Sequence, residues 1–142
     1  HTQVVSGVIL KRSCLKGKDF ILIGAISGAL AVLIGAFGSH WLGKMMNADE
    51  MRRFQTASEY HYIHTLALLF VGYYGNRKQS SKSLAVASYL FISGIVLFCT
   101  SLYASKVFPD WWMAVMPPIG GLCFVGGWVA LAFETIVSRV KG

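Results

Sequence analysis

The chain has 142 residues, of which 55% are apolar and only 13% are charged, whereas a soluble domain of this size carries about a quarter charged residues. The composition therefore excludes an ordinary soluble domain. The net charge of +7 would suggest a nucleic-acid partner in a soluble protein, but no basic face with interleaved aromatic residues is visible, and we expect no nucleic-acid binding.

The first predicted segment is a basic tail over residues 1–18. It carries Lys11, Arg12, Lys16 and Lys18 and no acidic residue. This pattern is compatible with the end of a cleaved mitochondrial targeting segment, although the segment is too short and too poor in Arg to establish one.

Four stretches without a charged residue follow, over residues 20–43, 60–76, 83–105 and 111–133. A helix needs about 20 residues to cross about 30 Å of hydrocarbon. The second stretch reaches that length only if it begins near residue 57, which places Glu59, His61 and His64 in its first turns. We therefore predict an all-α, integral membrane four-helix bundle over residues 19–137. Its spans are expected at about 20–43, 57–76, 83–105 and 111–134, followed by a short basic tail over 138–142.

The loop before the second span contains a helix-start signal. Asn47 precedes Asp49 and Glu50, and Asn is a preferred residue at helix N-termini. This pattern predicts a short amphipathic piece that runs through Met51 and Phe54.

Basic residues are distributed unequally between the two sides of such a bundle. The N-terminal tail, the loop over 76–82 and the C-terminal tail carry nine Lys and Arg, and the opposite side carries four. Because basic loops remain on the cytoplasmic side, both termini are predicted to face the cytoplasm, or the matrix in a mitochondrion.

Small residues form a stripe along the first span. Gly24, Gly28, Ala31 and Gly35 follow one another at spacings of four, three and four, which places them on one helical face, and Gly38 extends the series. Such stripes let membrane helices approach closely. With 15 glycines in the chain, a chance match is the alternative.

The fourth span opens with Pro117 and Pro118, followed by Gly120, Gly121 and Gly127. A proline pair removes two backbone donors, so we predict a kink or break near residue 116. The simplest interpretation is a packing feature, with Gly120 and Gly127 on one face. A hinge or a ligand-facing broken helix, as in transporters, is the alternative.

Polar residues gather where the predicted spans meet the non-cytoplasmic side: His40, Glu59, Tyr60, His64 and Tyr103. Ionisable groups within membrane spans are candidates for function because they are costly to place there. Since a link of about a dozen residues favours antiparallel neighbours, we expect His40 and His64 to approach each other and to share hydrogen bonds with Tyr60 or Tyr103.

Several interpretations of these histidines are open. The preferred one is that they bond neighbouring helices and fix their register. A haem held by His40 and His64, with His61 as a further candidate, is one alternative. A metal site built from these three and Glu59 is another, and a proton relay or solute path is a third. No Ser-His-Asp, P-loop or dinucleotide-binding pattern is present, so we predict no catalytic residue, no metal and no cofactor.

Several motifs follow one another along the chain: Gly35-Ala36-Phe37-Gly38-Ser39-His40, Phe54-Gln55-Thr56-Ala57, Glu59-Tyr60-His61, Leu97-Phe98-Cys99-Thr100-Ser101-Leu102-Tyr103 and Pro118-Ile119-Gly120-Gly121. In this order they resemble the membrane family known as domain of unknown function 423, whose animal members are called transmembrane protein 256. The resemblance extends from about Gly24 to Phe133. It implies four helices and no assigned activity, and the animal branch implies a mitochondrial location.

We accordingly expect a non-enzymatic protein that is a structural or accessory subunit of a larger membrane complex. Membrane lipids and other membrane protein subunits are its expected partners. The mitochondrial inner membrane, as part of a respiratory complex, is the expected location, with the bacterial plasma membrane as the alternative. A small-solute or proton transporter and a haem- or quinone-binding redox protein are the rival functions.

Overall fold

The computed structural model describes residues 15–78 and 81–142, and every regular element in these two ranges is helical. Residues 1–14 of the predicted basic tail lie outside the described residues. The elements are α2 (Gly17–Trp41), the 3₁₀ turn η1 (Leu42–Lys44), α3 (Ala48–Arg77), α4 (Lys82–Gly94), the π-helical turn η2 (Ile95–Cys99), α5 (Thr100–Tyr103) and α6 (Asp110–Lys141).

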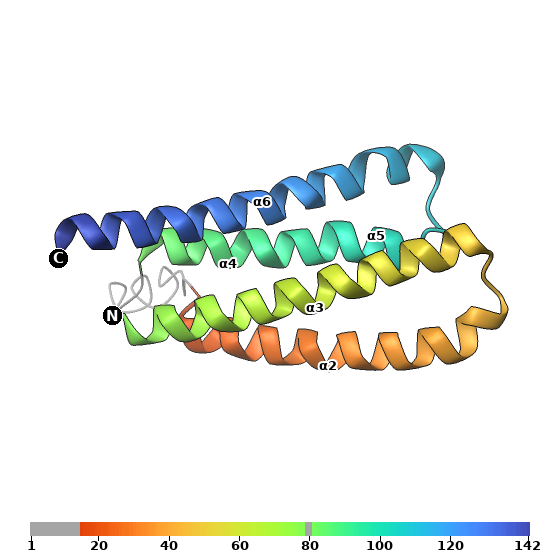
Figure 1. Ribbon diagram of the computed structural model, residues 1–142, viewed down its shortest axis with the longest axis horizontal. Coiled ribbons are helices and arrows are strands. Elements are labelled where there is room, and N and C mark those ends of the chain that lie inside the picture. The colour runs from red at the N-terminus through yellow and green to blue at the C-terminus, as the bar shows by residue number, and fades with distance from the viewer. Residues whose placement is uncertain (1–14, 79–80) are drawn as a thin grey trace, which may run out of the picture.

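The helices form two antiparallel hairpins that lie side by side (Figure 1). α2 packs mainly on α3, α4 packs mainly on α6, and α3 packs on α4 to join the two hairpins. The buried core lies at this junction and includes Leu68, Val71, Phe91 and Phe124. The prediction of an all-helical protein with four long helices is confirmed.

Three of these helical segments are long and apolar enough to cross a membrane, namely residues 17–44, 82–103 and 110–141. The fourth long helix, α3, is not among the three. Its first turns carry Asp49, Glu50, Arg52 and Arg53, and the tyrosines and histidines between residues 60 and 74 reduce its hydropathy further. Its 30 residues nevertheless run alongside α2.

Helix boundaries differ from the predicted ones at several places. Residues 17–18 of the predicted basic tail belong to α2, and the predicted C-terminal tail is helical as far as Lys141. The amphipathic piece after Asn47 is not separate from the second span, because α3 continues without interruption from Ala48 to Arg77. The predicted cap is present: Asn47 Oδ1 accepts from the Glu50 amide at 2.9 Å, and Glu50 Oε2 accepts from the Asn47 amide at 2.9 Å.

The prolines do not break the fourth helix. α6 continues through Pro117 and Pro118, so the predicted break near residue 116 does not occur. The irregular backbone lies instead on the partner helix, where η2 packs on α6. A Cβ added to Gly120 would lie 2.6 Å from the backbone nitrogen of Phe98, so the π-helical turn and α6 approach each other with no space for a side chain.

The glycine stripe of α2 faces α3, but its members are not equally close to that helix. A Cβ on Gly24 would lie 2.8 Å from Leu69, and one on Gly38 would overlap the Phe54 ring. A Cβ on Gly28 would make only an ordinary contact, 3.5 Å from Thr65. The two helices therefore approach each other more closely at Gly24 and Gly38, near the two ends of the stripe, than at Gly28.

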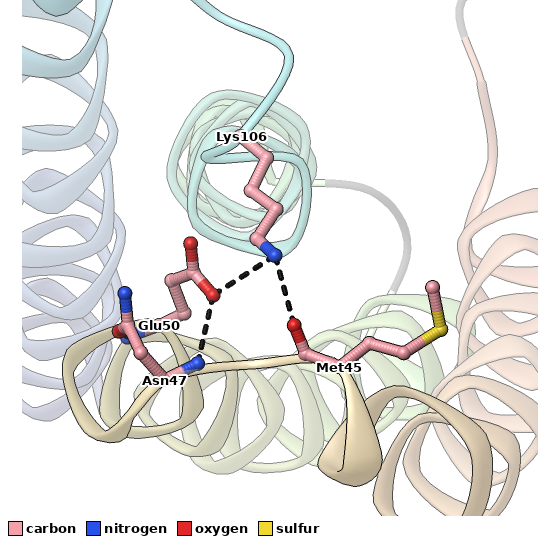
Figure 2. A network of polar contacts seen from close by, with 4 residues as sticks. All are labelled: Met45, Asn47, Glu50 and Lys106. Carbon is pink, nitrogen blue, oxygen red and sulfur yellow. Dashed lines mark hydrogen bonds and ion pairs between the residues drawn. The ribbon is translucent and has the colours of Figure 1, made fainter.

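The connections at one end of the bundle are held by the side chain of Lys106 (Figure 2). Lys106 Nζ donates to the carbonyl of Met45 at 3.0 Å and forms an ion pair with Glu50 Oε2 at 3.1 Å. The same carboxylate oxygen accepts from the Asn47 amide. This network joins the α2–α3 connection to the segment between α5 and α6.

Glu50 makes the stability of this network dependent on pH. The Asn47 amide, and then Lys106, hold the pKa of Glu50 below its usual value. A carboxylate with a lowered folded pKa stabilises the protein above its unfolded pKa of about 4.3, and this contribution is lost as the pH falls through the folded pKa. We expect Glu50→Gln to lower the thermal unfolding midpoint at pH 7 and to flatten its decline below about pH 4.3.

The matched control is Asp49→Asn. Asp49 makes only an exposed contact with Arg52, at 3.6 Å, so this change should leave the pH profile almost unaltered. If the thermal unfolding midpoint fell equally at low pH in the wild type and in Glu50→Gln, the pH dependence would not come from Glu50.

Candidate functional site

His61 links three helices through a chain of hydrogen bonds. Its Nε2 lies 3.0 Å from Ser27 Oγ on α2, and its Nδ1 lies 3.2 Å from the Tyr103 hydroxyl on α5. Ser27 Oγ also lies 2.7 Å from Thr65 Oγ1, and Thr65 follows His61 by one helical turn of α3. Thr65, Ser27, His61 and Tyr103 thus form one continuous chain, which we call the polar chain.

His64 bonds to the other hairpin. Its Nδ1 donates to the Tyr60 carbonyl at 2.8 Å, and its Nε2 accepts from the Trp128 indole N–H at 3.2 Å. Its ring stacks on Phe124 of α6, with 3.6 Å between ring centroids and 13° between ring planes. A carbonyl can only accept and an indole N–H can only donate, so this arrangement requires neutral imidazole with its proton on Nδ1.

The three-residue spacing of the two histidines accounts for their different partners. Residues three apart on a helix lie about 60° apart around its axis, so both side chains can face inward toward different neighbours. Their exposed fractions are only 4% for His61 and 5% for His64. An imidazole buried in a water-poor bundle requires hydrogen-bond partners, and both nitrogens of both rings have them.

The structure does not bring His40 to His64. Gly28 faces Thr65, the neighbour of His64, and His40 lies 12 residues beyond Gly28, or about 18 Å along the helix axis. His40 is exposed beside Trp41 and Lys44. The length of the α2–α3 connection predicted neighbouring helices, but it did not predict which residues would face each other.

The other members of the predicted cluster are divided between the two histidines. Tyr103 bonds to His61, and Tyr60 bonds to His64 through its backbone carbonyl. Glu59 is exposed. The candidate haem and metal ligands are not assembled, since within the described ranges no three His, Cys, Asp or Glu side chains gather as a metal site would require.

A groove of about 280 Å³ opens beside His61, between α2 and the segment formed by α4, η2 and α5. Ile26 and Leu30 on one side, and Val96 on the other, are each about half exposed, so the groove opens laterally along the spans. Ser27, His61 and Tyr103 also line it, and we call these three residues the polar floor. Isolated π-helical turns occur frequently at functional sites, and η2 forms part of this wall.

Sequence reasoning missed four residues of the site. Ser27 and Thr65 could have been noticed as hydroxyl groups inside apolar spans, where such groups bond to neighbouring helices. Trp128 lies within a span rather than at its boundary, which is an unusual position for Trp in a membrane helix. For Phe124 and for the π-helical turn, the sequence offers no comparable signal.

Comparison with known proteins identifies similar chains along most of the sequence. The family model described as a protein of unknown function (DUF423) matches residues 34–121. The UPF0382 membrane protein YwdK of Bacillus subtilis is 34% identical over 124 residues, which cover 87% of this chain and 98% of that protein. The UPF0382 inner membrane protein YgdD of Escherichia coli K12 is 37% identical over 128 residues, covering 90% and 97%. No solved structure matches the chain.

Proposed function

The chain belongs to the DUF423 family of membrane proteins, and from that premise we propose that it is a non-enzymatic accessory subunit that packs against another membrane protein within the bilayer. The similar proteins reported above come from bacteria and give no support to the expected mitochondrial location. The mitochondrial inner membrane stays a prediction from the family resemblance and the basic tail, and a bacterial plasma membrane is the alternative.

The observation that carries this proposal is the outward face of α2. Ala25, Ala29 and Ala36 are all exposed, and their spacings of four and seven place them on one face of the helix. This face is different from the glycine stripe, which packs on α3. Small residues at such spacings favour a neighbouring helix over lipid tails, because they allow close backbone approach.

The state of the polar groups supports a non-enzymatic role. The nitrogens of His61 and His64 are occupied by partners within the protein. A general acid, base or nucleophile must instead present its reacting atom to a substrate. In this arrangement, the two histidines join helices.

We also propose that both ends of the described chain face the cytoplasm, or the matrix. The start of α2, the end of α3, the start of α4 and the end of α6 lie at one end of the bundle (Figure 1). Lys16, Lys18, Lys78, Lys82 and Lys141 belong to these segments. Basic residues concentrated at one end favour the cytoplasmic side for that end.

Ala29→Leu tests the subunit role. Overpacking an interface costs about 1–3 kcal/mol, so we expect the variant to retain its thermal stability while its association weakens about tenfold or more. The measurement is the mass of the protein in native gels after extraction in a mild detergent, together with identification of co-purified proteins.

The control for this experiment is Val129→Leu. Val129 is exposed on α6, and enlarging it should not alter the assembly. A wild-type protein that migrates only as a single free chain would contradict the proposal. Equal assembly of wild type and Ala29→Leu would show that this face of α2 is not the interface.

A further inference from the structure

We propose that the groove between α2 and η2 binds a membrane quinone, with the quinone carbonyl on the polar floor and the hydrocarbon tail along the apolar walls. This site is separate from the outward alanine face of α2, and the inference does not depend on the subunit role. It rests on the shape of the groove, the depth of its polar floor and the number of hydrogens in the polar chain.

The walls of the groove indicate an occupant that comes from the lipid phase. Ile26, Leu30, Ile95 and Val96 are all apolar, and the opening lies between two segments apolar enough to span the bilayer. A volume of about 280 Å³ lies just below the usual range for ligand pockets, about 300–1,000 Å³. The groove therefore suits one small ring or one chain, whereas another helix, about 10 Å in diameter, requires more room.

The depth of the polar floor distinguishes between lipids. Ser27 is the eleventh of the 25 residues of α2, inside a segment apolar enough to span the bilayer, and the ring of His61 bonds to it there. Phospholipid headgroups remain at the two surfaces of the hydrocarbon layer. A polar group inside a span, as Ser27 is, matches a neutral lipid whose polar part can enter the hydrocarbon, as the ring of a quinone can.

The polar chain contains one more donor hydrogen than it has hydrogen bonds. Thr65, Ser27, neutral His61 and Tyr103 each supply one O–H or N–H hydrogen, but only three contacts join them. If Thr65 donates to Ser27, Ser27 to His61 and His61 to Tyr103, the Tyr103 hydroxyl hydrogen remains free to donate.

This spare hydrogen defines the chemistry of the ligand. Hydroxyl rotors and the histidine tautomer can adjust to present the donor where an acceptor lies, and Tyr103 lines the groove. The complementary group is a hydrogen-bond acceptor on an otherwise apolar molecule. A quinone carbonyl meets this requirement, and its tail can leave through the lateral opening.

The test uses the purified full chain in phosphatidylcholine nanodiscs, titrated with decylubiquinone, and with decylbenzene as a probe that has the same tail but no carbonyl. Nanodiscs without protein measure how much of each probe enters the lipid alone. We expect saturable binding of one decylubiquinone per chain and weaker binding of decylbenzene. Tyr103→Phe keeps the ring against Phe54 and removes the donor, so its affinity for the quinone should fall about five- to tenfold.

Val96→Trp fills the mouth of the groove without touching the polar chain and should abolish saturable binding. Val86→Trp is the control, since Val86 is similarly exposed on α4 and does not line the groove. Absence of saturable binding in the wild type, or unaltered binding in Val96→Trp, would overturn the proposal. If Tyr103→Phe bound the quinone as well as wild type, the groove would hold only a hydrocarbon tail, which also overturns it.

Discussion

Gly120→Ala is expected to destabilise the protein by about 3 kcal/mol, because overpacking against rigid backbone lies at the upper end of the usual range. The added methyl group would lie 2.6 Å from the Phe98 backbone nitrogen and 2.7 Å from the Phe98 Cβ. A flexible side chain could move away from such a contact, but a backbone nitrogen inside the π-helical turn cannot move without separating η2 from α6.

The matched control for Gly120→Ala is Gly121→Ala, at the neighbouring residue. A Cβ added to Gly121 would meet nothing within 4 Å, although Gly121 was predicted from the sequence to belong to a packing feature. Gly121→Ala should therefore leave stability unchanged or raise it slightly, because Ala is a better helix former than Gly by about 1 kcal/mol. The measurement is the unfolding free energy in mixed detergent micelles. Equal effects of the two changes would show that η2 and α6 are not in the close contact described.

The four long helices could be predicted because the bilayer imposes their length. Charge-free stretches such as residues 83–105 have few alternatives to a spanning helix. The start of α3 was predicted less well, since the start signal at Asn47 predicted only a short amphipathic piece through Met51 and Phe54. The capping interaction of Asn47 and the continuous backbone hydrogen bonding of α3 instead make the amphipathic piece and the second span one helix.

The candidate site could be predicted only in part. The inward orientation of His61 and His64 follows from their helical spacing, and both were candidate residues from the sequence. Their partners depend on how α2 slides along α3, which is set by contacts such as Gly24 with Leu69 and Gly38 with Phe54. A shift of one helical turn, about 5.4 Å, would have given His61 a partner other than Ser27. Sequence spacing alone does not determine that register.

His64→Leu is expected to destabilise the protein by about 2–4 kcal/mol, as the sum of two losses. The Trp128 indole N–H, which lies within a candidate span, would lose its acceptor, at about 1–3 kcal/mol, and the stacked contact with Phe124 would lose about 1 kcal/mol. His64→Gln should retain more stability, because the glutamine carbonyl oxygen can still accept a hydrogen bond. The measurement is the free energy of unfolding in detergent micelles, for the wild type and for both variants.

A double-mutant cycle with Trp128→Phe separates the hydrogen bond from packing. Trp128→Phe removes the donor but retains an aromatic ring near Phe91, whose centroid lies 5.2 Å from that of Trp128. In this background His64→Leu no longer leaves an unpaired N–H, so its effect should be smaller by about 1 kcal/mol or more. Additive effects would mean that the 3.2 Å contact between Trp128 Nε1 and His64 Nε2 contributes nothing to stability. Because the contact joins α3 to α6, a positive coupling would identify His64 as a residue that fixes the two hairpins against each other.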